Sequence, residues 1–239
     1  MSRRMLVAAG VLLCAVAPAV RAQDLADLCR RVAQPPVGAW SEYRATGGGR
    51  IPFTSMRMAV TGQETRGGVS YIWLEFSAHG ITMGDGGDTV SMVNRMLVRG
   101  FGPNMSDPVA AVMKFGSAPA MLMPVNAPGG GGPGSPGSSS LKDCTSSKVV
   151  GWESVTVPAG TFRALHVQDA EGGGDTWVVP DLPFGVVKSG SWGESADSGQ
   201  MVLTAHGMGA RSAITETPRP YDPQAFMQLM QRMMRPQDR

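Results

Sequence analysis

The sequence predicts a mainly β protein. We expect a curved antiparallel sheet that forms a half-barrel-like meander, with a short N-terminal helix and an amphipathic C-terminal helix. Three observations lead to this fold class. Apolar residues alternate with a period of two through most of the chain, as in half-buried strands. Gly and Pro interrupt these runs at short intervals, and a period near 3.6 occurs only towards the two ends.

Residues 1–22 are typical of a secretory signal peptide. Two arginines precede an apolar run over residues 5–20, and small residues precede the cleavage expected before Gln23. A membrane anchor is the alternative, but Pro18 interrupts a run that is shorter than the roughly 20 residues of a spanning helix. We therefore expect an exported protein, periplasmic or extracellular, with at most a peripheral association with the membrane.

The charge balance gives no support for a nucleic-acid partner. The whole chain has 21 Lys and Arg against 19 Asp and Glu, a net charge of +2. Removal of residues 1–22 takes away three arginines and no acid, so 18 basic residues face 19 acidic ones and the net charge becomes about −1. A mature chain of this charge lacks the basic surface that phosphate backbones or anionic membranes attract.

We expect one β-rich domain over residues 23–221, opened by a short helix. Residues 24–33 place apolar side chains at helical spacing, and Pro35 and Pro36 follow. Alternation then predicts strands within residues 39–46, 53–62, 69–77 and 89–98, and less regularly within 109–125.

The stretch NAPGGGGPGSPGSSS, residues 126–140, predicts a flexible loop, because Gly, Pro and Ser cannot bury enough apolar surface to offset their ordering entropy. Alternation resumes after it, with strands expected at 148–157, 162–167, 176–179, 184–192, 200–208 and 210–216. Pro158 with Gly160, and Pro180 with Pro183, indicate turns between neighbouring hairpin strands.

The C-terminal segment, residues 222–239, predicts an amphipathic helix and tail. Pro223 suits the first helical position after Asp222, and the helix is expected to run to about Arg235. Its apolar stripe consists of Phe226, Met227, Leu229, Met230, Met233 and Met234.

The sequence contains no recognisable catalytic constellation. The three histidines stand in unrelated segments, no serine lies in a nucleophile elbow, and Asp85 and Asp88 are more typical of a hairpin turn than of a calcium loop. His166 and His206 lie in strand-like runs and are expected to be structural. We therefore expect no enzyme, no metal and no cofactor, although scattered residues can converge in three dimensions.

Methionine is the unusual feature of the composition. Fifteen of the 17 methionines remain after the signal peptide, several of them in Met-x-Met spacing. Thioethers suit Cu(I), so copper binding is one alternative. The methionines also follow strand and helix periodicity, as core residues would, and this is the interpretation we favour.

Strand parity places a set of apolar side chains on one face of the expected meander. Because methionine adapts to varied partners, we predict that these residues form the floor of an apolar groove and that the last helix covers it. The alternative is that they form a permanent core. The floor residues are Met56, Met58, Ile72, Leu74, Phe76, Met92 and Met96, and the covering residues are Phe226, Met230 and Met233.

The signal peptide, the leading helix, the long meander and the element VPAGTFRALHV…TWVVPDLPFGVVKSGS together resemble exported bacterial domains of unknown function. Their strand order is similar to that of the periplasmic lipoprotein-carrier half-barrel, the LolA/LolB-like fold. The resemblance spans most of residues 24–217 and implies a concave face that accepts acyl chains. No carrier residue can be matched one by one to this chain, and the Gly/Pro loop and Met-rich last helix depart from the pattern.

The sequence therefore predicts an exported, non-catalytic binding protein that accommodates an apolar ligand, such as a lipid or lipoprotein acyl chain, on the concave face of a curved sheet. The alternative is a structural or protein-interaction module of the cell envelope with no small ligand, whose partner would be an envelope protein.

Cys29 and Cys144 are the cysteines left after export, and we predict that they form a disulfide. They lack the C-x-x-C spacing of a redox or metal pair. The bridge should stabilise the fold by about 2–4 kcal/mol. Alkylation followed by mass measurement of protein purified from an oxidising compartment should detect no free thiol, whereas two alkylated cysteines would contradict the prediction.

Overall fold

The computed structural model describes residues 34–47, 53–82, 89–101, 107–125, 147–169, 174–190 and 199–234. The predictions that concern the signal peptide, the first helix, Cys29, Cys144, Asp85, Asp88 and the loop 126–140 lie outside these residues.

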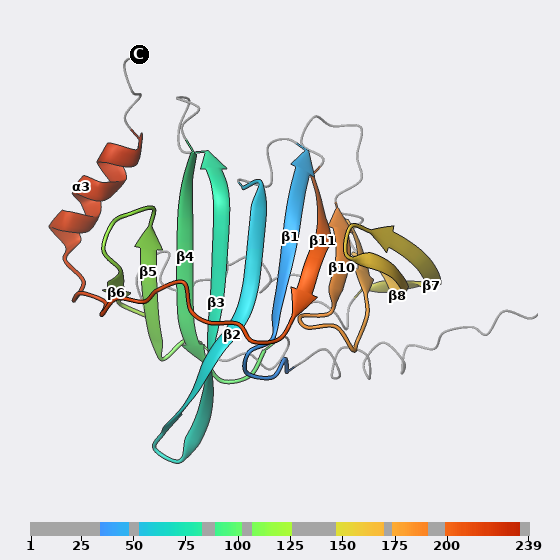
Figure 1. Ribbon diagram of the computed structural model, residues 1–239, viewed down its shortest axis with the longest axis horizontal. Helices are drawn as coiled ribbons and strands as arrows, with labels where there is room; N and C mark the ends of the chain where they lie inside the picture. The colour runs from blue at the N-terminus through green and yellow to red at the C-terminus, as the bar shows by residue number, and fades with distance from the viewer. Residues whose placement is uncertain are drawn as a thin grey trace, which may run out of the picture.

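The described residues form one open, antiparallel sheet of eleven strands, in the order β6-β5-β4-β3-β2-β1-β11-β10-β9-β8-β7 (Figure 1). The predicted fold class is thereby confirmed. The strands are β1 (Trp40–Gly47), β2 (Ser55–Arg66), β3 (Val69–Thr82), β4 (Thr89–Val98), β5 (Ala110–Phe115), β6 (Met121–Met123), β7 (Lys148–Val157), β8 (Gly160–Gln168), β9 (Asp175–Val178), β10 (Val186–Gly190) and β11 (Gly199–Gly207).

The sheet consists of two meanders that meet where β1 pairs with β11. Strands β1 to β6 follow one another on one side of this seam, and β11 back to β7 follow on the other. The pairing runs from Trp40 opposite Gly207 to Gly47 opposite Gly199, with a shift in register after Glu42. The first and last strands of the sequence therefore lie side by side in the middle of the sheet.

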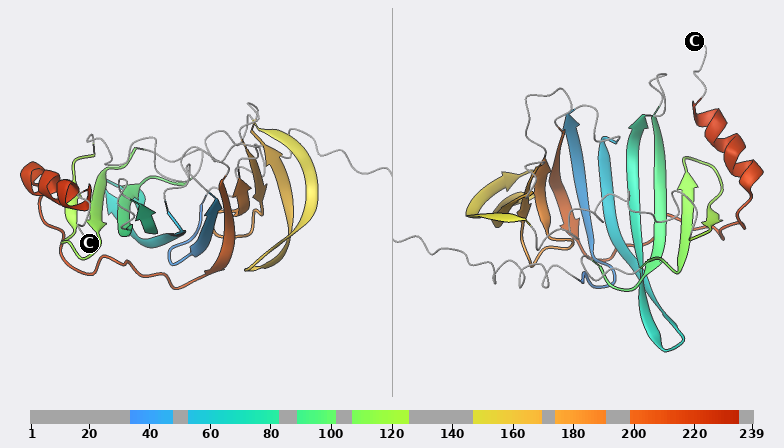
Figure 2. Two further views of the ribbon diagram at one scale, coloured as in Figure 1. Left: turned by 90° about the horizontal axis from the view of Figure 1, so that it is seen from above. Right: turned by 180° about the vertical axis from the view of Figure 1, so that it is seen from behind.

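Viewed from above, the sheet curves, and β7 and β8 turn back at one end (Figure 2). The turn between these two strands reaches β11, where the Ala159 N–H donates to the Leu203 carbonyl at 3.3 Å. The turn at Pro158 and Gly160 and the β9–β10 hairpin agree with the punctuation of the sequence.

One face of the sheet, which we call the core face, carries a continuous apolar cluster. In the register, Met58 lies opposite Phe76 and Leu74 lies opposite Met96, so alternate residues of neighbouring strands share this face. The cluster contains side chains from every strand of the sheet, including Tyr43 of β1 and Leu165 of β8. Its burial is the main apolar contribution to the stability of the fold.

The other face carries residues 208–222, which we call the strap. The strap crosses the sheet from β11 towards β6, in front of the strands in Figure 1. The buried carboxylate of Glu75 holds it, since the Ser212 hydroxyl donates to Oε2 at 2.5 Å and the Ala213 N–H donates to Oε1 at 2.9 Å. Ile214 packs beside Val112 and Ala120.

The prediction of a strand at residues 210–216 is therefore wrong. This segment is irregular, and it lies across the strands rather than beside one of them. The Glu75 carboxylate accepts from Ser212 and Ala213, and the Ala210 N–H donates to the Gly38 carbonyl, which precedes β1, so the segment forms no ladder of hydrogen bonds with a neighbouring strand. The alternation that predicted a strand reflects the packing of Ile214 against the sheet.

The helix α3 (Pro223–Met234) follows the strap and lies beyond the β6 edge of the sheet (Figures 1 and 2). The prediction of this helix is confirmed. The Asp222 carboxylate accepts the N–H groups of Gln224 at 2.9 Å and Ala225 at 3.1 Å, which is the hydrogen bonding of an N-cap. Within the described part of the chain, no helix is long and apolar enough to cross a membrane.

We expect Glu75→Ala to destabilise the protein by about 1–3 kcal/mol, because the substitution leaves the N–H of Ala213 without its acceptor. Chemical denaturation monitored by circular dichroism measures the change in the free energy of unfolding. Glu42→Ala is the control, since this side chain is exposed on β1. Equal stabilities of the two variants would show that the strap does not depend on the buried carboxylate.

Candidate functional site

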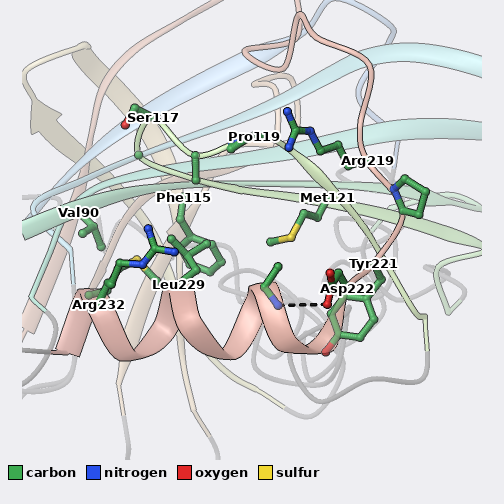
Figure 3. A pocket seen from close by; sticks show the side chains of 15 residues that line it. Val90, Phe115, Ser117, Pro119, Met121, Arg219, Tyr221, Asp222, Leu229 and Arg232 are labelled. Atoms are coloured by element: carbon green, nitrogen blue, oxygen red, sulfur yellow. Dashed lines mark hydrogen bonds between the residues drawn. The ribbon is translucent and has the colours of Figure 1, made fainter.

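A pocket of about 880 Å³ lies between α3, the strap and the turn that joins β5 to β6 (Figure 3). Most of its lining is apolar, and its charged lining residues are Arg219, Asp222 and Arg232. The larger apolar lining residues are Val90, Phe115, Met121, Tyr221, Leu229 and Met233.

The sheet side of the pocket is formed where β5 ends at Phe115. Gly116 has a φ of +50°, which favours glycine, and it allows the chain to leave the strand sharply. The Gly116 N–H donates to the Ser91 carbonyl at 2.8 Å, and the Ala118 N–H donates to the Phe115 carbonyl at 2.9 Å. These bonds hold the turn, so Phe115 faces the helix with its ring centroid 6.4 Å from that of Phe226.

The strap side is held to the sheet just before the helix begins. The Lys114 ammonium lies 2.7 Å from a carboxylate oxygen of Glu216, and the same oxygen accepts the Ala120 N–H at 3.3 Å. Three residues later, the Arg219 N–H donates to the Ala120 carbonyl, and the Arg219 carbonyl accepts the Leu122 N–H, each at 2.8 Å. The backbone at this wall of the pocket is therefore fixed to β6.

The hydrogen bond from Lys114 lowers the pKa of Glu216 to about 2, with further contributions from backbone N–H groups. In an unfolded chain the same carboxyl would have its ordinary pKa of 4.5. The charged form of Glu216 consequently favours the folded state above pH 4.5, and this contribution is lost as the pH falls towards 2.

The helix contributes the third side of the pocket through its partly buried stripe. Phe226, Leu229, Met230 and Met233 pack against the core cluster but stay partly exposed, and Met227 is 56% exposed. The helix thus covers the edge of the sheet, but its apolar stripe is not fully buried there.

The predicted floor residues lie together on the core face, but largely as packed core. Six of them are buried, and Met92 is partly buried. Of the predicted covering residues, Met233 lines the pocket, while Phe226 and Met230 pack against the core cluster. Ligand binding by these ten residues stays a prediction. The pocket between α3 and the β5–β6 turn lies towards the β6 edge of the sheet rather than over the middle of the floor.

Several lining residues were missed from the sequence, among them Phe115, Met121, Arg219 and Arg232. Phe115 and Met121 border a turn, GSAPA, within residues 109–125, where the alternation of apolar residues is irregular. Arg219 lies in a Pro-Arg-Pro stretch that has no periodicity. Only the path of the strap brings it beside β6.

A second polar cluster surrounds His166 on β8. Nε2 of His166 lies 2.6 Å from Asp175 Oδ1, and Nδ1 lies 3.3 Å from Glu153 Oε1. The indole of Trp177 stacks on the imidazole at 4.5 Å and donates to Glu153. Both ring nitrogens are therefore engaged, as expected for a structural histidine. Among the described residues, no group of three or more His, Cys, Asp or Glu is placed to hold a metal ion.

No family model and no curated protein matches the sequence. Among solved structures, the chain is similar to a Bacteroides fragilis protein described as exported, with a YmcC-like fold, at 14% identity and a TM-score of 0.34, over 73% of this chain and 97% of that one. It is also similar to a Parabacteroides distasonis protein described as a lipoprotein, at 12% identity and a TM-score of 0.34, over 74% and 98%.

A third similar structure is the MucA/MucB complex of Pseudomonas aeruginosa, at 12% identity and a TM-score of 0.33. This match covers 80% of the present chain and 58% of that chain. These likenesses are distant, and we assign neither a family nor a function from them.

We expect Glu216→Gln to lower the thermal unfolding temperature near neutral pH, because the ion pair with Lys114 is lost. The variant should also lose less stability than the wild type as the pH falls from 4.5 towards 2. Thermal unfolding across this pH range measures both effects, with Glu42→Gln as the exposed control. Parallel pH profiles for wild type and Glu216→Gln would contradict the prediction.

Proposed function

We propose that the protein is an exported, non-catalytic binding protein that holds an apolar ligand in the pocket beneath α3. The observation that carries this proposal is the pocket itself. Its volume of about 880 Å³ falls in the range of small-molecule sites, roughly 300–1,000 Å³, and its wall is mainly apolar, as in such sites.

The incomplete burial of α3 supports the proposal. Leu229 and Met233 line the pocket and stay partly exposed, although they belong to the apolar stripe of the helix. Unbranched thioether side chains repack at low cost, so a helix held by methionines can shift to admit a ligand. The helix then acts as an adaptable cover, and the edge of the sheet supplies the opposite wall of the pocket.

The size of the apolar contribution fits reversible binding. Each buried methylene contributes a favourable free energy of about 0.8 kcal/mol. Ten methylenes of an acyl chain would therefore contribute roughly 8 kcal/mol to binding, before the free-energy cost of association is subtracted. A lipid or acyl chain is therefore the kind of ligand that the pocket can hold and release.

A second candidate function is protein interaction at the opposite end of the sheet. Strand β7 is the last strand in the sheet order, and two of its apolar side chains are exposed, Val150 at 54% and Trp152 at 40%. An end strand of this kind offers backbone groups to an added strand of a partner. The partner would be an envelope protein with an extended segment that pairs with β7.

Ala225→Trp tests the pocket. Ala225 lines the pocket from the first turn of α3, so an indole there should occupy the ligand volume and weaken binding of an apolar fluorescent probe by about tenfold or more. Gln228→Trp is the matched control, because this residue is exposed on the same helix and does not line the pocket. Fluorescence titration measures probe affinity for the wild type and both variants.

The proposal fails if the folded wild type takes up no apolar probe, and if mass spectrometry of a solvent extract of the native protein detects no lipid. It also fails if both tryptophan variants bind the probe as tightly as the wild type does.

A further inference from the structure

We infer that the ligand of this pocket is an anionic amphiphile, an acyl or alkyl chain with a negatively charged head group, and that Arg219 and Arg232 receive the head group. The inference rests on the proposed function and adds to it the chemical class of the ligand and the orientation in which the ligand binds.

The charge of the pocket is the first argument. Its charged lining residues are two arginines and Asp222. The Asp222 carboxylate already accepts two N–H groups of the first turn of α3. Within the part of the chain that the structure describes, no hydrogen bond or ion pair occupies the guanidinium groups of Arg219 and Arg232. The pocket therefore offers two guanidinium groups for an anion.

The position of the charges is the second argument. Both arginines are exposed, whereas Phe115 and Met121 are buried side chains of the pocket wall. A chain that packs against Phe115 and Met121 can leave its head group at the solvent-exposed rim. An anion at the rim keeps part of its hydration, which avoids the large cost of burying a charge.

The two arginines come from different elements and border the same pocket (Figure 3). The backbone of Arg219 is hydrogen-bonded through its N–H to Ala120, just before β6, and through its carbonyl to Leu122 of β6, so this backbone is fixed. Arg232 projects from the last turn of α3, on the side of the helix that faces Phe115 in Figure 3. A guanidinium presents several N–H donors in a plane and can bind a carboxylate or a phosphate through two parallel hydrogen bonds.

Arg232 also has a structural role that the test must separate from binding. A cation in the last turn of a helix interacts favourably with the helix dipole. That role affects the stability of α3, but it gives no preference for a charged over an uncharged ligand. The preference for head-group charge is therefore the informative measurement.

The experiment compares three ligands with the same alkyl chain, dodecanoate, dodecyl phosphate and the neutral dodecanamide, in displacement of an apolar fluorescent probe. We expect the full-length wild type to bind the better of the two anions at least tenfold more tightly than the amide at low salt, and the difference to shrink at high salt. The preferred anion identifies the head group as a carboxylate or a phosphate.

Arg219→Gln and Arg232→Gln should each weaken anion binding by about fivefold to tenfold and leave amide binding unchanged. Arg219→Lys should restore part of the loss, because the charge returns without the planar donor geometry. Arg66→Gln is the control, since this arginine pairs with Glu64 at the far tip of the β2–β3 hairpin. Circular dichroism verifies that each variant is folded.

Equal affinity of the wild type for the anions and the amide, or unchanged anion binding in both glutamine variants, would overturn the inference and leave the apolar pocket standing. Failure of all three ligands to displace the probe, in a wild type that binds the probe, would also overturn it. If the wild type binds neither probe nor ligands, the proposed function itself fails.

Discussion

The pairing of β1 with β11 is the constraint on which the rest of the structure depends. At the start of this seam, the Trp40 indole lies over Gly207, where an added Cβ atom would stand 3.1 Å from the ring. Its Nε1–H donates to the Met208 carbonyl at 3.3 Å, and the Thr204 hydroxyl donates to the Glu42 carbonyl at 3.0 Å. These contacts place the last strand of the sequence in the middle of the sheet, joining two meanders into one continuous core face.

The position of β11 determines the path of the chain after it. Because β11 ends in the middle of the sheet, the strap must cross several strands before the chain reaches the β6 edge. Polar groups on the sheet hold it along this path, Glu75 near the middle and Lys114 near the edge. The helix consequently lies beside Phe115, and the pocket forms where its partly buried stripe meets the β5–β6 turn.

The strap and the helix α3 differ in how firmly they are attached to the sheet. Hydrogen bonds to the buried Glu75 and an ion pair with Lys114 attach the strap to the sheet. The side chains of α3 that pack against the core cluster are only partly buried. Elements with few buried contacts open at lower free energy than the core does. A firm wall beside an adaptable cover is the arrangement that the proposed ligand binding requires.

The sequence by itself determined the features that depend on near neighbours in the chain. Period-two alternation placed most strands and put Leu74 and Met96 on one face, and Asp222 with Pro223 marked the start of the helix. The tertiary structure alone decided the β1–β11 seam, the irregular course of residues 210–216 and the meeting of Phe115, Arg219 and Arg232 at one pocket. The physical reason is range: alternation reflects which face of its own strand a residue occupies, whereas a strand's partner and a strap's path depend on contacts between residues that are far apart in the sequence.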